Sequence, residues 1–214
     1  MSGMKVISAL IVAGSVALTG LIGTTASHAA DVCKIDVEVD DLTPEQAQSA
    51  YDCMIDGLLA GWQKGGHPVA AEYKTWTAAA SYPAAVGTHG NRLLFTYVND
   101  IGKEQYLKFE EEGVTMPVGS ILAKESFNAH TKGDKIGQLR AGPLFLMEKV
   151  APGTFDETDN WKYTLITPGG KAWLESGVTE PAKVQNACHE CHSLVLEDQD
   201  AMYYPDWDAR VATN

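Results

Sequence analysis

Cys188, Cys191 and His192 form a Cys-x-x-Cys-His motif late in the chain. At this spacing the two thiols are placed to add to the vinyl groups of a haem, and the histidine is placed to ligate its iron. A thioredoxin-like redox pair usually lies in a βαβ setting near the start of a helix. A zinc site needs further ligands at short spacing, and the sequence has no second Cys-x-x-Cys. The motif therefore predicts one covalently attached haem c.

Covalent haem attachment requires export, and residues 1–29 have the features of a cleaved signal peptide. Lys5 supplies a short positive region, the run from Val6 to Ile22 is apolar and uncharged, and small residues precede a cleavage position after Ala29. A retained membrane anchor is the alternative, because the apolar run has about the minimum length needed to span a membrane. We expect a mature protein that begins near residue 30 and lies in the periplasm, where disulfides persist.

The remaining two cysteines, Cys33 and Cys53, are predicted to form a disulfide. An even number of cysteines left over in an oxidising compartment favours pairing. The bond would connect the N-terminal segment to the first helix, and the alternative is two buried free thiols.

The chain is acidic, with 16 basic and 28 acidic residues among 214 and a formal net charge of −12. Removal of Lys5 with the signal peptide makes the mature charge one unit more negative. This charge argues against nucleic acid and anionic membranes as partners. It suits a cationic redox partner protein, although an acidic surface also serves solubility alone.

The secondary-structure pattern predicts an α+β fold with an antiparallel β-sheet and flanking helices. Thr43, Pro44 and Gln46 are typical of a helix N-terminus with a capping box, and Gly65-Gly66 ends this helix. Further helices are expected at residues 69–77 and 102–112, and a helix start is expected at 182–187, ahead of the haem motif. Strands are expected at 92–99, 120–127, 142–150 and 161–167. We expect an N-terminal helical extension at residues 30–68 and a haem domain at 69–214.

The iron's second axial position decides what the haem does. An electron carrier needs a second strong ligand there, whereas a gas binder or catalyst needs an open position. The candidate ligands in the mature chain are Met54, Met116, Met147, Met202, His67, His89, His130 and His189. None lies in a recognisable ligand motif, and the β-rich pattern favours five-coordinate iron. A six-coordinate electron carrier remains an alternative.

Several short motifs, in this order, resemble the cytochrome P-460 family. They are Tyr73–Trp76, Thr96-Tyr97-Val98, Tyr106, the strand Val118–Phe127 with its Lys124-Glu125 pair, Asp159–Tyr163, the late haem motif and Tyr204-Pro205. The resemblance covers about residues 72–208. It leaves residues 31–67 unaccounted for, so this segment looks like an N-terminal addition.

The resemblance implies roles for individual residues. Cys188 and Cys191 match the thioether sites, His192 matches the proximal ligand, and Lys124 matches a lysine that forms a covalent link to the porphyrin edge. The alternative for Lys124 is a solvent-exposed position at the edge of the sheet. Strand alternation places Leu122, Lys124 and Ser126 on one face, but it does not say whether this face meets the haem or the solvent.

Four further candidates complete the expected site. Phe127 and Phe145 are candidate walls of the distal pocket, Tyr204 is a candidate contact of the haem edge, and Glu148 is a candidate distal proton acceptor. For each of them, ordinary packing or a solvent-exposed strand end is the alternative.

The resemblance also implies a reaction. Members of the family oxidise hydroxylamine, using nitric oxide or another oxidant to complete the conversion to nitrous oxide. A sister branch, the β-type cytochromes c′, lacks the lysine link and binds nitric oxide in an apolar pocket. Simple electron transfer is the third alternative. The family resemblance further implies a homodimer.

Overall fold

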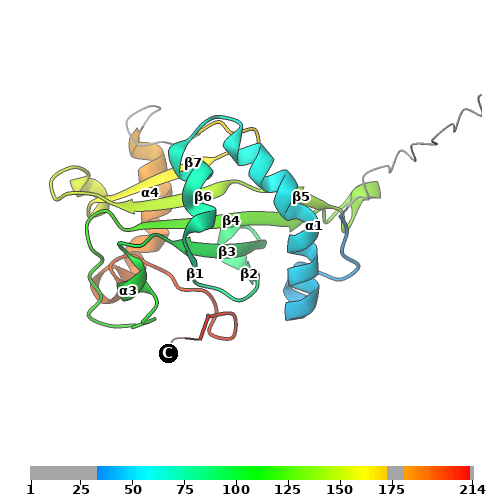
Figure 1. The fold of residues 1–214 in the computed structure, drawn as a ribbon, viewed down its shortest axis with the longest axis horizontal. Helices are drawn as coiled ribbons and strands as arrows, with labels where there is room; N and C mark the ends of the chain where they lie inside the picture. Colours follow the sequence, from blue (N-terminus) through cyan, green and yellow to red (C-terminus); the bar gives the residue numbers. More distant parts are fainter. Residues whose placement is uncertain (1–32, 173–180, 213–214) are drawn as a thin grey trace, which may run out of the picture. The chain divides into compact units, whose positions relative to one another are not determined.

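An antiparallel β-sheet forms the framework of the protein (Figure 1). The computed structural model describes residues 33–172 and 181–212. Within them the sheet follows the order β1-β3-β4-β6-β7, while β2 pairs with β3 and β5 pairs with β4. The strands are β1 (Thr77–Ala78), β2 (Ala84–Val86), β3 (Arg92–Val98), β4 (Ile121–Ala129), β5 (Leu139–Ala141), β6 (Leu144–Lys149) and β7 (Trp161–Ile166).

The four predicted strands are present as β3, β4, β6 and β7, which confirms the antiparallel α+β fold. The strands β1, β2 and β5 have only two or three residues each, too few to show an alternating pattern. At the centre of the sheet the register places three side chains next to one another on the same face. Thr96 of β3 is paired with Lys124 of β4, which is paired in turn with Phe145 of β6.

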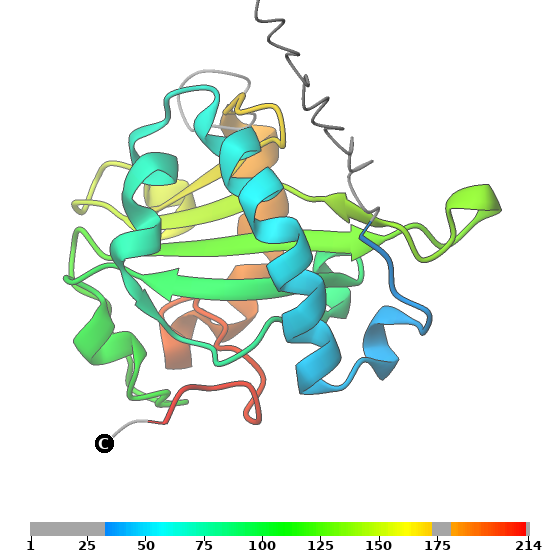
Figure 2. The ribbon, with the colours of Figure 1, turned by 45° about the vertical axis from the view of Figure 1, so that its right-hand side comes forward.

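Helix α1 (Pro44–Gln63) covers one face of the sheet (Figures 1 and 2). Its start confirms the predicted capping box, because the Thr43 side chain accepts from the Gln46 backbone and the Gln46 side chain accepts from the Thr43 backbone. The predicted disulfide between Cys33 and Cys53 is present and ties the preceding segment to α1. A disulfide closing a loop of this length stabilises by about 3 kcal/mol in the chain-entropy description.

Helix α4 (Pro181–His192) lies on the opposite face of the sheet (Figures 1 and 2). The sheet therefore separates two clusters of buried apolar side chains. One cluster lies under α1 and includes Trp62, Phe95 and Phe127. The other lies on the α4 side and includes Leu122 and Met147.

The remaining helices are short. They are α2 (Pro68–Glu72), α3 (Lys103–Tyr106) and α5 (Leu196–Gln199), with 3₁₀ turns η1 (Val39–Asp41), η2 (Tyr73–Thr75), η3 (Gly87–His89), η4 (Gly133–Lys135), η5 (Asp156–Thr158) and η6 (Ser193–Val195). The predicted helix at 102–112 is much shorter in the structure. Phe109 adopts a left-handed backbone with φ 52°, and the three carboxylates at 110–112 would oppose the helix dipole at a C-terminal end.

The predicted signal peptide, residues 1–29, lies outside the described residues. In the part of the chain that the structure describes, no helix is long and apolar enough to cross a membrane. The domain boundary near residue 68 stays a prediction, although α1 packs directly against the sheet of the following segment.

Candidate haem-binding site

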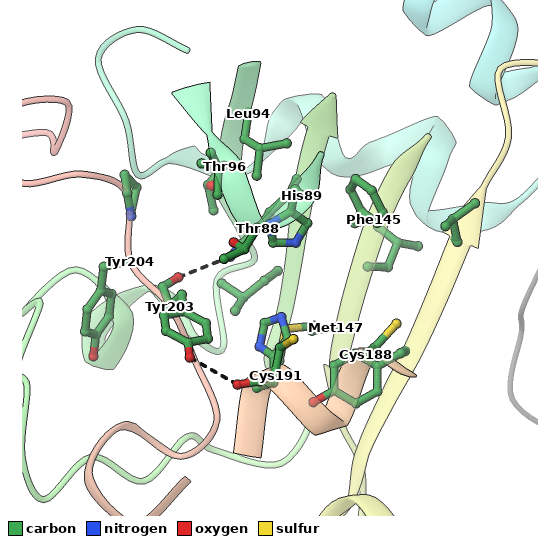
Figure 3. Close-up of a pocket in the computed structure, with 18 of the residues that line it drawn as sticks. Thr88, His89, Leu94, Thr96, Phe145, Met147, Cys188, Cys191, Tyr203 and Tyr204 are labelled. Atoms are coloured by element: carbon green, nitrogen blue, oxygen red, sulfur yellow. Dashed lines mark hydrogen bonds between the residues drawn. The ribbon is translucent and has the colours of Figure 1, made fainter. Parts of the chain in front are cut away.

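A cavity of about 400 Å³ lies between the α4-facing side of the sheet and α4 itself (Figure 3). Strands β2, β3, β4, β6 and β7 supply one wall, and η3, α4 and the C-terminal segment at 203–206 supply the others. Much of the lining is apolar, including Leu94, Leu122 and Phe145. A cavity of this size with few polar groups is typical of a site for a large, mostly apolar cofactor.

The side chains of the haem motif face this cavity from α4. Cys188 and Cys191 are free thiols that line it, and His192 is buried beside them. Residues three and four apart lie on one face of a helix, so the spacing of the motif turns all three side chains to the same side. Burial raises the pKa of the Cys188 thiol, which therefore stays protonated.

His192 is held in the orientation of a metal ligand. Its Nδ1 is 2.7 Å from the backbone oxygen of Ala201, and an imidazole that donates from Nδ1 leaves Nε2 free for a metal. Burial lowers the pKa of His192 to about 4, with a further contribution from the charge of Lys124, so the ring is neutral near pH 7. Two free thiols and a neutral, oriented imidazole on one cavity fit a haem c.

Lys124 extends into the same cavity from β4 and is buried. Its Nζ donates one hydrogen bond, to the backbone oxygen of Tyr203 at 3.2 Å. Burial lowers the pKa of the Lys124 amine from 10.5 to about 8, which increases the fraction of neutral, nucleophilic amine at physiological pH. The structure thus places Lys124 with the two cysteines and the histidine, although they lie 64 to 68 positions further along the chain.

Of the other four predicted site residues, two line the cavity and two do not. Phe145 and Tyr204 line the cavity, and the Tyr204 ring also packs on Tyr106 with ring centres 5.0 Å apart. Phe127 does not line this cavity, because it lies on the opposite sheet face and packs on Tyr51 of α1.

Glu148 also lies outside the cavity. It is paired across the strands with Lys162, with 3.7 Å between their charged atoms, and its side chain is 38% exposed. The predicted distal carboxylate is therefore not Glu148. Among the described residues that line the cavity, only Asp206 carries a carboxylate, and Asp206 is exposed.

Of the eight candidate axial ligands, His89 and Met147 line the cavity. His189 points elsewhere, with its ring nitrogens 3.1 Å from the hydroxyl of Tyr163 and 3.1 Å from the carboxylate of Asp159. Burial, and to a smaller extent the charge of Lys124, lower the pKa of His89 to about 3, so this ring is also neutral. No local sequence signal separated His89 from the other candidates.

Other lining residues were missed by sequence reasoning. Thr88 lies next to His89, Tyr203 supplies the oxygen that Lys124 contacts, and Thr96 lies beside Lys124 in the sheet (Figure 3). Strand pairing gives the signal for Thr96, because a residue directly opposite Lys124 must point to the same side.

A comparison with known protein families agrees with this geometry. The family described as Cytochrome P460 matches residues 70–204, which include β3, β4, β6, β7, Lys124 and the haem motif. The chain belongs to the cytochrome P460 family. No curated protein sequence matches the chain significantly.

Proposed function

We propose that the protein is a periplasmic haem c enzyme that oxidises hydroxylamine. One observation carries the proposal: a single cavity brings together two free thiols, a neutral oriented histidine and a buried lysine. Cys188 and Cys191 would hold the haem through thioethers, His192 would ligate its iron, and Lys124 would contact the edge of the porphyrin. Membership of the cytochrome P460 family supports this assignment.

Bound haem would supply a redox centre that accepts electrons from the substrate. In the reaction proposed here, one hydroxylamine and one nitric oxide give nitrous oxide, water, one proton and one electron. The electron passes to a redox partner protein, and the acidic chain favours a cationic one. The proton passes to water, because among the described residues no buried carboxylate lines the cavity.

The residues of the chain would prepare the cavity for this chemistry. Leu94, Leu122 and Phe145 exclude water from the sheet side, and the Ala201 carbonyl fixes the ring of His192. The Lys124 amine is desolvated and held by a hydrogen bond, a state that would suit bonding to the porphyrin edge. Replacing a ring C–H by a C–N bond releases two electrons and two protons, which a peroxide would take up as it is reduced to water.

The test is to purify the haem-loaded protein, digest it and locate haem by mass spectrometry. The expected result is haem on the Cys188–Cys191 peptide that is also linked to the Lys124 peptide, with a strongly red-shifted Soret band after reduction. Hydroxylamine should be consumed when nitric oxide and an electron acceptor are both supplied. Lys124→Met should abolish the link and the red shift, whereas Lys162→Met, which changes a lysine outside the cavity, should leave both unchanged.

A second candidate function is nitric oxide binding without catalysis. The apolar lining and the lack of a buried carboxylate in the described cavity favour it. This function predicts a free Lys124 peptide, an ordinary reduced spectrum and rapid nitric oxide binding. Steady hydroxylamine turnover with nitric oxide and an electron acceptor would rule it out.

A further inference from the structure

His89 and His192 face each other across the cavity although they come from opposite sides of it. His192 belongs to α4, whereas His89 ends the turn η3 between β2 and β3. Figure 3 shows the His89 ring on the opposite side of the cavity from Cys188 and Cys191. The centres of the two imidazole rings are 6.4 Å apart, and the ring planes are inclined by 77°.

This separation is the one that a single metal ion between the two rings requires. A metal–imidazole bond is about 2 Å long and a ring centre lies roughly 1.1 Å from its nitrogen, so two opposed ligands have ring centres roughly 6.3 Å apart. A histidine serving as a distal base would have to leave room for a bound substrate, and its ring centre would lie well beyond this distance. We propose that His89 is the second axial ligand of the haem iron in the resting protein.

The surroundings of His89 agree with this role. Its Nδ1 is buried and has no hydrogen-bond partner among the described residues, although buried polar atoms in folded proteins are nearly always paired. The ring packs edge-on against Phe145, with ring centres 5.2 Å apart. The Arg92 guanidinium donates to the His89 backbone oxygen at 2.5 Å, which holds the turn in place.

The position of His89 also makes this ligand displaceable. Gly87, Thr88 and Gly90 around it are exposed, and Gly90 and Asn91 both adopt left-handed backbone conformations. A short exposed turn opens at lower free energy than the central strands. His89 would therefore leave the iron before hydroxylamine or nitric oxide binds, and its dissociation would limit the rate of entry. This inference rests on the proposed haem attachment at Cys188 and Cys191. It adds that His89 controls the access of small ligands to the iron.

The experiment compares the spin state of the ferric iron in four haem-loaded proteins by absorption and electron paramagnetic resonance. Wild type should be low-spin with two nitrogen ligands, and His89→Ala should be fully high-spin. Added imidazole should restore the low-spin signal in His89→Ala. His130→Ala, a histidine outside the cavity, should match wild type, and so should Met147→Leu, which removes the other candidate ligand lining the cavity.

Cyanide binding supplies a kinetic measurement on the same proteins. In wild type the observed rate should reach a plateau with cyanide concentration, set by dissociation of His89. In His89→Ala the rate should rise linearly, and cyanide should bind about 10- to 1,000-fold more tightly if the open form of wild type is a minor state. His89→Met provides a second variant, because a methionine ligand keeps iron low-spin and raises its reduction potential.

The outcomes separate this inference from the proposed function. Protein that carries no covalent haem would overturn both. Haem-loaded wild type that is high-spin would overturn only the role of His89. A low-spin signal that persists in His89→Ala, or that is lost in Met147→Leu instead, would also overturn it.

Discussion

Lys124 and Glu125 are neighbours on β4, both buried and both ionisable, yet they lie on opposite faces of the sheet in contrasting surroundings. Glu125 accepts hydrogen bonds from the hydroxyls of Tyr51 and Tyr73, each at 2.7 Å, and from Lys74 at 3.2 Å. Lys124 donates one bond to a backbone oxygen and faces a cavity. A buried charge with a full set of partners cannot be removed without leaving those partners unpaired, so Glu125 belongs to the framework. Lys124 has a single hydrogen-bond partner among the described residues and lies beside a cavity, so it is available to a ligand.

The Glu125 network joins segments that are distant in sequence. Tyr51 comes from α1, Tyr73 and Lys74 come from η2, and Lys74 also contacts the hydroxyl of Tyr97 on β3. Burial and the nearby Glu125 carboxylate raise the pKa of both Tyr51 and Tyr73, so these hydroxyls remain protonated donors. The network therefore fixes α1 and η2 on the sheet face that does not carry the cavity.

Replacing Glu125 should give the largest effect on stability. Glu125→Ala leaves Lys74 and two tyrosine hydroxyls without their acceptor, and removing one partner of a buried ion pair typically costs 3–5 kcal/mol. Because the Lys74 side chain is 29% exposed, we expect a loss near the lower end, about 3 kcal/mol, in urea unfolding.

Glu148→Ala is the matched control for that measurement. Its ion pair with Lys162 is partly exposed, so its loss should change stability by about 0.5 kcal/mol or less. A loss below about 1 kcal/mol for Glu125→Ala would contradict the structural role assigned to the network.

Replacing Lys124 should have a smaller effect of opposite sign. Lowering its pKa from 10.5 to about 8 corresponds to about 3 kcal/mol of unfavourable burial at neutral pH, at 1.36 kcal/mol per pH unit. Lys124→Met removes this cost but also loses one hydrogen bond worth about 1 kcal/mol. We expect haem-free protein, prepared by also replacing Cys188 and Cys191 with alanine, to gain about 2 kcal/mol in urea unfolding. A loss of stability would mean that Lys124 belongs to the framework like Glu125.

Local signals explain why much of the fold was predictable. The capping box at Thr43 and the strand at 92–98 each depend on residues within a few positions of one another. The leftover cysteines also predicted their disulfide correctly. The prediction of a helix at 102–112 was wrong beyond Tyr106, because Phe109 adopts a left-handed backbone. No local sequence pattern indicated this conformation.

The site was less predictable because it depends on strand register and on which sheet face meets α4. Alternation put Lys124 and Phe127 on opposite faces of β4, so the sequence itself already argued against both of them lining one cavity. It contained no signal that η3 would bring His89 within 6.4 Å of His192. The partners of Glu125 were hidden for the same reason, since they lie 51–74 positions away in the chain.

The pH dependence of stability should give the smallest effect, because the three partners of Glu125 offset part of its burial. Burial is the largest influence and raises the pKa of Glu125 above 4.5, against the opposing effects of Lys74, Tyr51 and Tyr73. The folded protein therefore holds this proton more tightly than the unfolded chain. Its contribution to stability is complete below about pH 4.5 and is lost as the pH rises through the folded-state value.

Glu125→Gln isolates this contribution, because glutamine has a similar shape and does not titrate. The free energy of unfolding of wild type, measured relative to Glu125→Gln by urea unfolding at a series of pH values, should fall as the pH rises above about 4.5. A difference that rises with pH instead would mean that the ion pair with Lys74 outweighs burial. Glu125 would then differ from Lys124 not only in the number of its partners but also in the sign of its net electrostatic environment.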